Sequence, residues 1–173
     1  MLAVYRQEIL SLLDICQAIQ DSAIGTGIRE SVWVFPIIET IHILALALSV
    51  GMIIMLDLRL IGAGMRHASA GQIMGQLKKW YLVGFATMVA SGVFLFWSEA
   101  AKCYRSNSFR IKLLLLLLVG VNAVVFEIIY KPFMHKWDSG ELPPPGAKMC
   151  GWFSMILWIG VIGFGRWTAY GMK

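Results

Sequence analysis

Five polar residues, Glu127 among them, stand inside long apolar stretches of this chain, where such side chains are rare. Glu39 and His42 lie in WVFPIIETIH, Asn122 lies in LLLLLLVGVNAVVFE, and Arg166 lies in WIGVIGFGRWTAY. An ionisable side chain inside a membrane span costs roughly 2.5–3.5 kcal/mol on insertion scales, so its presence indicates a functional or pairing role. The candidate site therefore comprises Glu39, His42, Asn122 and Arg166.

The spacing of the four residues predicts how they meet. At ~1.5 Å of rise per residue, His42 lies roughly 15 Å and Glu39 roughly 10 Å into the first apolar stretch. Asn122 falls at about the depth of His42, and Arg166 lies roughly 6 Å from the same face. Glu39 and His42 are three residues apart and share a helix face. We therefore expect one cluster, in which Arg166 neutralises Glu39; its simplest role is to fix the register of the helices.

A more specific interpretation is a haem b site with His42 as an axial ligand, because histidine commonly holds haem iron. His67 and His135 fall in loops on the opposite side, far from His42 in depth. This arrangement disfavours a haem held by two histidines. It leaves a five-coordinate haem, or a haem completed by methionine.

Two other kinds of site stay open. Copper(I) is bound by methionine and histidine, and Met52 and Met55 lie roughly three turns along the same stretch from His42. The chain has ten methionines, but none forms a tight cluster with histidine. A proton or ion pathway through Glu39, His42 and Glu127 is the other alternative.

The composition predicts a membrane protein. Of the 173 residues, 58% are hydrophobic and 14% are charged. In a soluble domain about half of the residues are apolar and about a quarter are charged. A membrane-spanning helix needs about 20 mostly apolar residues. Four such spans are predicted, at about 32–56, 80–97, 111–130 and 149–170.

Two further segments predict helices lying in the membrane interface. Residues 6–20 repeat apolar side chains at helical spacing opposite a polar face, and residues 69–79 show a weaker version of the same pattern. The predicted fold class is all-α: a four-helix transmembrane bundle with an N-terminal amphipathic interfacial helix, as one membrane domain over residues 1–173. Three pairs of small residues at four-residue spacing predict close helix contacts: Ala45 with Ser49, Ala47 with Gly51, and Ala86 with Ala90.

Several classes of function are excluded or unsupported. The net charge of +5 comes from basic residues beside apolar stretches, where lipid headgroups attract them, so no nucleic-acid partner is expected. The three isolated cysteines, Cys16, Cys103 and Cys150, argue against a disulfide framework. No hydrolase or nucleotide-binding motif is present, so no catalytic residue is assigned. The stretch from Asp57 to Arg59 is expected to be a solvated membrane edge.

Several motifs, in order, carry a resemblance over residues 28–170. They are WVFPIIETIH, DLRLIG, YRSNSFRIKLLLLLLVGVNAVVFE and WIGVIGFGRWTAY. Together they resemble a family of uncharacterised small bacterial four-helix inner-membrane proteins. That family is distantly similar to copper-resistance D-type proteins and membrane b-type cytochromes, which implies haem or copper chemistry. The matching positions are Trp33, Pro36, Glu39, His42, Asp57, Arg59, Phe109, Lys112, Asn122, Ala123, Gly165, Arg166 and Tyr170.

The sequence thus predicts a small non-enzymatic membrane subunit or anchor of a redox or electron-transfer assembly. It is expected in the bacterial inner membrane, with haem b bound through His42 and with Glu39, Asn122 and Arg166 completing the cofactor site. A copper- or proton-handling transport protein and a purely structural accessory subunit remain alternatives. Expected partners are the lipid bilayer and either other membrane subunits or further copies of this chain.

Overall fold

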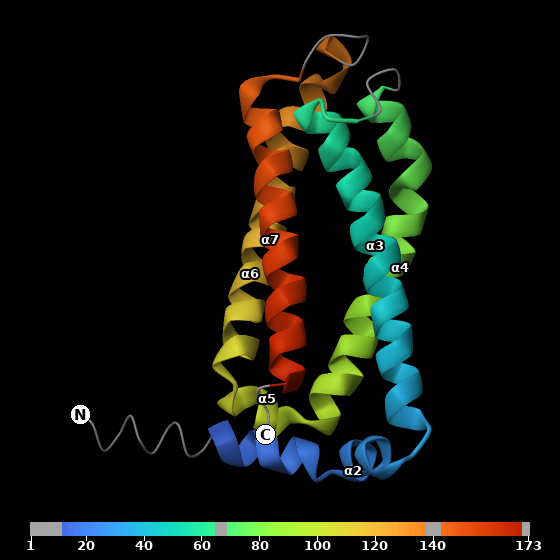
Figure 1. Ribbon diagram of the computed structural model, residues 1–173, viewed down its shortest axis with the longest axis vertical. Helices are drawn as coiled ribbons and strands as arrows, with labels where there is room; N and C mark the ends of the chain where they lie inside the picture. Colours follow the sequence, from blue (N-terminus) through green and yellow to red (C-terminus); the bar gives the residue numbers. More distant parts are fainter. Residues whose placement is uncertain (1–11, 65–68, 138–142, 171–173) are drawn as a thin grey trace, which may run out of the picture.

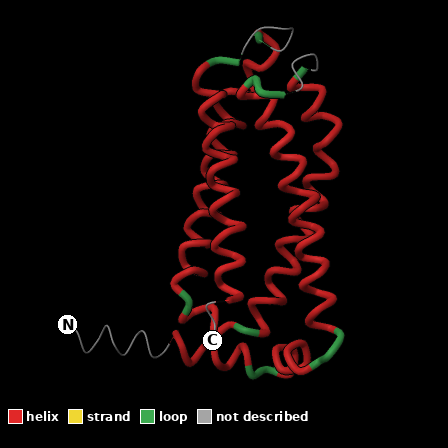
Figure 2. Tube along the Cα trace, viewed as in Figure 1, coloured by secondary structure: helices red, strands yellow, loops and turns green. Residues whose placement is uncertain are grey.

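The computed structural model describes residues 12–64, 69–137 and 143–170. All regular structure in these ranges is helical, with short loops between the helices (Figure 2). Four long helices form the bundle in Figure 1: α3 (Val34–Ile61), α4 (Ala70–Ser98), α6 (Asn107–Val125) and α7 (Pro145–Tyr170). A π-helical turn (Phe126–Tyr130) and a 3-10 helix (Lys131–Lys136) extend α6. The shorter α2 (Ala23–Glu30) and α5 (Ala100–Arg105) lie at one end, with a helical segment over residues 12–20.

Local capping explains where α3 begins and ends. The Ser31 hydroxyl accepts a hydrogen bond from the amide of Val34 (3.1 Å) and so satisfies a free donor of the first turn. Pro36 lies within that first turn, where its missing N–H costs no helical hydrogen bond. The helix stops at Gly62, whose φ of 80° is a left-handed conformation that glycine adopts without strain.

Helix α4 is longer than the predicted span. The Ser69 hydroxyl caps it by accepting from the amide of Gln72 (3.0 Å), and the helix then runs without a break to Ser98. The prediction of a separate interfacial helix over residues 69–79 is therefore wrong. Those residues are the first turns of α4, since nothing between Ala70 and Trp80 interrupts the helix.

The bundle consists of two helical hairpins, α3–α4 and α6–α7, which pack against each other through α3 and α7. Helix α3 packs against α4 and α7, and α6 packs against α7. Gly84 of α4 sits against α3, because a Cβ there would lie 3.0 Å from the Ser49 amide nitrogen and 3.1 Å from the Ala45 carbonyl oxygen. Small residues permit this close backbone approach. Trp158 and Val161 of α7 complete the core at this level.

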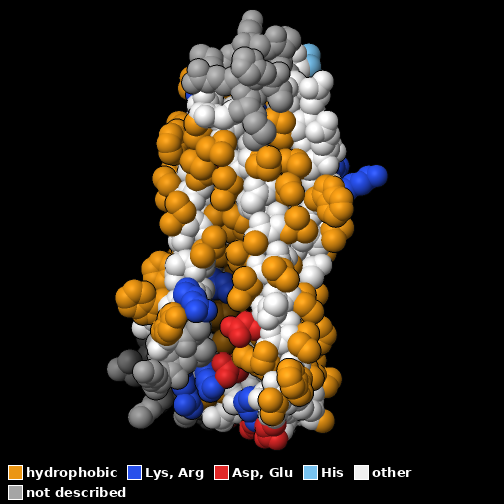
Figure 3. Space-filling model, turned by 45° about the vertical axis from the view of Figure 1, so that its right-hand side comes forward, with side chains coloured by type: hydrophobic (Ala, Val, Ile, Leu, Met, Phe, Trp, Pro, Cys, Tyr) orange, Lys and Arg blue, Asp and Glu red, His pale blue; other side chains and the backbone are white. Residues whose placement is uncertain are grey.

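The outer surface of the four long helices is apolar. Leu117 of α6 is 63% exposed and Ile159 of α7 is 71% exposed, among many large hydrophobic side chains that face outward. On the face in Figure 3, most acidic and basic side chains gather at the lower end of the bundle. All four long helices are long and apolar enough to cross a membrane. The predicted all-helical class with four such helices is confirmed.

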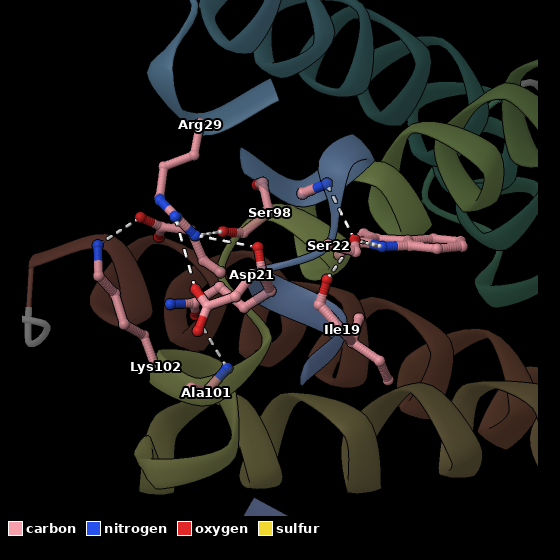
Figure 4. A network of polar contacts seen from close by, with 11 residues as sticks. Ile19, Asp21, Ser22, Arg29, Ser98, Ala101 and Lys102 are labelled. Atoms are coloured by element: carbon pink, nitrogen blue, oxygen red, sulfur yellow. Dashed lines mark hydrogen bonds and ion pairs between the residues drawn. The ribbon is translucent and has the colours of Figure 1, made fainter. Parts of the chain in front are cut away.

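The segment over residues 12–30, here called the platform, lies across the lower end of the bundle (Figure 1). Figure 4 shows how it is held. Arg29 Nη1 donates to the carbonyl of Ser98 (3.3 Å), and Trp97 Nε1 donates to the Ser22 hydroxyl (2.9 Å). Both hydrogen bonds join the platform to the end of α4, so the platform is fixed to the α3–α4 hairpin.

Candidate functional site

A large apolar cavity lies between the two hairpins. Its volume is about 760 Å³, and its walls come mainly from α4 and α6, with α3 and α7 at the back. Leu82 and Phe85 of α4, and Leu113 of α6, line it and are partly exposed. The cavity is therefore open sideways between α4 and α6, where the surrounding surface is apolar.

His42 of α3 lines this cavity and is half-buried. Its Nδ1 lies 3.0 Å from the hydroxyl oxygen of Ser91 on α4, and that hydroxyl lies 2.7 Å from the carbonyl of Thr87. The same hydroxyl lies 3.1 Å from the Met88 carbonyl. When its hydrogen is donated to either carbonyl, its oxygen accepts from the His42 tautomer that carries its proton on Nδ1. In that tautomer Nε2 keeps a free lone pair, as a metal-ligating histidine requires.

Gly92 makes room for the imidazole ring. A Cβ at this position would lie 3.2 Å from His42 Cε1, closer than ordinary van der Waals contact. The glycine and Ser91 are adjacent on α4, so one turn of that helix provides both the hydrogen bond and the space. This geometry fixes the orientation of His42 at the cavity wall.

Lys112 of α6 brings a charged group to the cavity. Its ammonium lies 3.6 Å from the Cβ position of Gly165 on α7, and it interacts electrostatically with His42. It forms no ion pair with any acidic residue in the described ranges. A half-buried cation without a counter-charge is costly, so this end of the cavity favours an anionic group.

The predicted pairing of Glu39 with Arg166 is not formed. Arg166 is exposed, donates from Nη2 to the hydroxyl of Tyr170 (3.1 Å), and lies 5.0 Å from the centre of that ring. Glu39 is half-buried, does not line the cavity, and has no ion-pair partner within the described ranges. Arg166 is satisfied one turn along its own helix, so it does not need to reach α3.

Asn122 also lies apart from His42. Its Nδ2 donates to the Cys150 carbonyl (3.0 Å) and links α6 to α7. Because α6 begins at Asn107, before the expected start of the span, Asn122 is about 22 Å along its helix. His42 is only about 12 Å from Val34. Of the four predicted site residues, only His42 lines the large cavity.

Ser91, Lys112 and Asp57 were not among the predicted site residues. Lys112 and Asp57 stood only among the motif positions. Asp57 and Arg59 are 4% and 3% exposed, so the prediction of a solvated membrane edge at these residues is wrong. No signal in the sequence marks Ser91 as the partner of His42, because the two are 49 positions apart.

The described residues contain no preformed cluster of acidic, cysteine or histidine side chains that would support the copper alternative. Within residues 12–64, 69–137 and 143–170, no group of three or more such side chains could hold a metal ion. Met88 lines the cavity with His42, but Met52 lies in a smaller pocket farther along the bundle.

The fold and the cavity define an all-helical bundle with four helices long and apolar enough to cross a membrane and a cavity that opens sideways. The chain belongs to DUF6644, a family of unknown function whose model matches residues 29–171. Neither a curated protein nor a solved structure matches it significantly. Membership of an uncharacterised family is thus confirmed. No match links the chain to copper-resistance D-type proteins or b-type cytochromes, and that similarity stays a prediction.

The thiols near the platform are expected to differ strongly in reactivity. Burial, with a smaller contribution from the charge of Glu99, raises the pKa of Cys103 to about 11. A raised pKa leaves only about 0.1% thiolate at pH 8, and the thiolate is the nucleophile. We expect N-ethylmaleimide to modify the partly exposed Cys16 long before Cys103, as measured by peptide mass spectrometry. Denatured protein is the control; equal rates in the native protein would contradict the burial of Cys103.

Proposed function

We propose that the chain is a multi-pass protein of the bacterial inner membrane, with α3, α4, α6 and α7 as its spans. Its support is the apolar outer surface and, on the face in Figure 3, the charged side chains that gather at the lower end. The platform then lies in the interface, as an amphipathic segment fixed to the end of α4. Glu39 and Arg166 lie near the same interface, where water or headgroups solvate them.

Within this membrane protein, His42 holds haem b as an axial ligand in the cavity between α4 and α6. One observation carries this proposal: His42 lines a cavity of about 760 Å³, and its Nδ1 lies 3.0 Å from the Ser91 hydroxyl, which supports the tautomer whose Nε2 is free to bind iron. A bound haem supplies one-electron transfer. The chain is accordingly a non-enzymatic subunit or anchor of a redox assembly.

The residues present fit a haem in three respects. The cavity volume falls within the roughly 300–1,000 Å³ of ligand sites, and its walls are predominantly apolar. His42 offers Nε2 as a ligand, while the contact of its Nδ1 with the Ser91 hydroxyl orients the ring. Lys112 lacks a counter-charge in the described part of the chain, and the propionate carboxylates of haem would provide one.

The alternatives have less support. The proton pathway relied on Glu127, but this residue is exposed and forms an ion pair with Lys131 one turn along the helix. A purely structural accessory subunit would not need the cavity that His42 and Lys112 line.

The test is haem uptake by the purified chain. We expect the protein in lipid nanodiscs to bind added haemin at one equivalent and to show a Soret band that changes on reduction with dithionite. Empty nanodiscs titrated in parallel correct for haem dissolved in lipid. A protein that takes up no more haem than empty nanodiscs would overturn the proposal.

A further inference from the structure

The large cavity is an elongated space that runs along α4 and α6. On α4 its lining residues extend from Tyr81 to Phe96, which is about 22 Å along the helix, and on α6 they extend from Phe109 to Ala123, about 21 Å. One leaflet of a bilayer holds about 15 Å of hydrocarbon, half of the ~30 Å core. The cavity is therefore long enough for one extended lipid chain.

The polar groups of this cavity gather at its platform end. Lys112 lies near the start of α6, and His42 lies against Gly92 near the end of α4. Among the other described lining residues only Tyr81 and Trp158 carry a polar side-chain atom, and the rest are apolar. An elongated cavity with a cation near one end and apolar walls beyond it matches a molecule with an anionic head and a long apolar tail.

Two stacked aromatic rings bridge α4 and α6 at the platform end of the cavity. Phe96 and Phe109 both line the cavity, and their ring centroids are 5.7 Å apart. Lys112 lies three residues beyond Phe109, on the side away from the platform. An anion that pairs with Lys112 in the cavity therefore lies inside this aromatic pair. A compact carboxylate fits there better than a phosphate that also carries glycerol and a second chain.

We propose that the cavity binds a long-chain fatty acid, with its carboxylate at the Lys112 ammonium and its chain along α4 and α6 toward Tyr81. Lys112 has no acidic partner in the described part of the chain, and a carboxylate gives it a charge-assisted hydrogen bond. The proposal rests on the membrane placement proposed above but does not require haem at His42. Because haem propionates would pair with the same lysine, haem and the fatty acid are alternative occupants of the cavity.

The experiment measures retention of tritiated palmitate by haem-free phosphatidylcholine nanodiscs that carry the full chain, relative to empty nanodiscs. The comparison probe is 1-hexadecanol, which has the same chain length and a neutral head. We expect palmitate to be retained at least about tenfold better, because only the carboxylate neutralises Lys112. Equal retention of the two probes would overturn the proposal.

A second lipid composition distinguishes a fatty acid from a phospholipid headgroup. Part of the phosphatidylcholine is replaced by phosphatidylglycerol, both in the nanodiscs that carry the chain and in the empty ones. Palmitate retention should stay the same. A loss of palmitate would assign the cavity to the anionic phospholipid and would contradict the fatty-acid proposal.

Two variants that each remove one positive charge locate the head. Lys112→Gln should reduce palmitate retention about tenfold and leave retention of 1-hexadecanol unchanged. Arg110→Gln is the matched control, because Arg110 lies on the same turn of α6, is exposed, donates from Nη2 to the Tyr104 carbonyl (3.0 Å) and does not line the cavity. Equal losses in the two variants would show a general attraction of the anion to basic residues and would defeat the proposal.

Two glycine positions locate the chain of the fatty acid. Nothing stands within 4 Å of the Cβ position of Gly120 or Gly163, but only Gly120 lines the cavity. Gly120→Phe should reduce palmitate retention about tenfold, because the ring takes up space that the chain needs, whereas Gly163→Phe should retain it. Unchanged retention in Gly120→Phe would place the chain elsewhere and refute the proposal. Since no haem is present, failure of haem uptake leaves this result standing, and the reverse also holds.

Discussion

A His42→Ala variant is expected to lose haem while keeping the helical bundle. Removing the imidazole removes the nitrogen ligand proposed for haem, and the hydrogen bond to Ser91 with it. Changes to such supporting hydrogen bonds alone typically cost about 10–100-fold in metal affinity, so loss of the ligand itself should cost at least as much. The measurement is the Soret absorbance per mole of purified protein, alongside a circular dichroism spectrum to show that the helices remain.

Two variants serve as comparisons for His42→Ala. His135→Ala removes an exposed histidine of the 3-10 helix, whose ring nitrogen faces its own turn, and should retain full haem binding. Ser91→Ala leaves His42 in place without its orienting partner and should show an intermediate loss, about 10–100-fold. An unchanged Soret band in His42→Ala would contradict the assignment of His42 as the ligand.

A Gly84→Leu variant is expected to destabilise the contact between α3 and α4 more than any substitution on the outer surface. A side chain at this position meets the backbone of Ala45 and Ser49 at 3.0–3.1 Å, and backbone atoms cannot move aside without separating the helices. Overpacking of this kind costs about 1–3 kcal/mol and occasionally more. Thermal unfolding in detergent, followed by circular dichroism, measures the loss.

Gly75→Leu is the matched control for Gly84→Leu. Gly75 lies on the same helix, and nothing stands within 4 Å of its Cβ position. The two variants therefore add the same leucine to α4 and differ only in what the leucine meets. Equal midpoints of unfolding for the two variants would show that α4 does not pack against α3 at Gly84.

The sequence was sufficient to predict the four helices, because long apolar stretches leave little choice of structure. Their boundaries were harder to predict. Hydropathy alone placed the second span at residues 80–97, but α4 starts at Ala70 because Ser69 caps it. The polar residues of its first three turns hid the fact that one helix contained both segments.

Close helix contacts could be predicted only in part. Ala45 and Ser49 are buried against Gly84, as their spacing indicated. The pairs Ala86 with Ala90 and Ala47 with Gly51 show the same four-residue spacing, but all four residues are exposed, so those two predictions were wrong. Small residues at this spacing show that a helix has a smooth face; they do not show which helix covers it.

Among the site residues, His42 could be predicted from the sequence because an ionisable group inside an apolar stretch is rare. Its neighbours could not, since Ser91 and Lys112 come from other helices, and the crossing of α3, α4 and α6 decides which side chains meet. Depth estimates for Asn122 and Arg166 treated each span as a straight rod with known ends. The longer α6 and the local contact of Arg166 with Tyr170 removed both residues from the cluster.

The sideways opening of the large cavity has a consequence for how any affinity is measured. Access between α4 and α6 is through the apolar surface of the bundle rather than through its ends. For a chain embedded in a bilayer, the ligand concentration that matters is then its mole fraction among the lipids. Apparent dissociation constants expressed per volume of water will rise as more lipid or detergent is added. The same protein will therefore give different values at different ratios of lipid to protein.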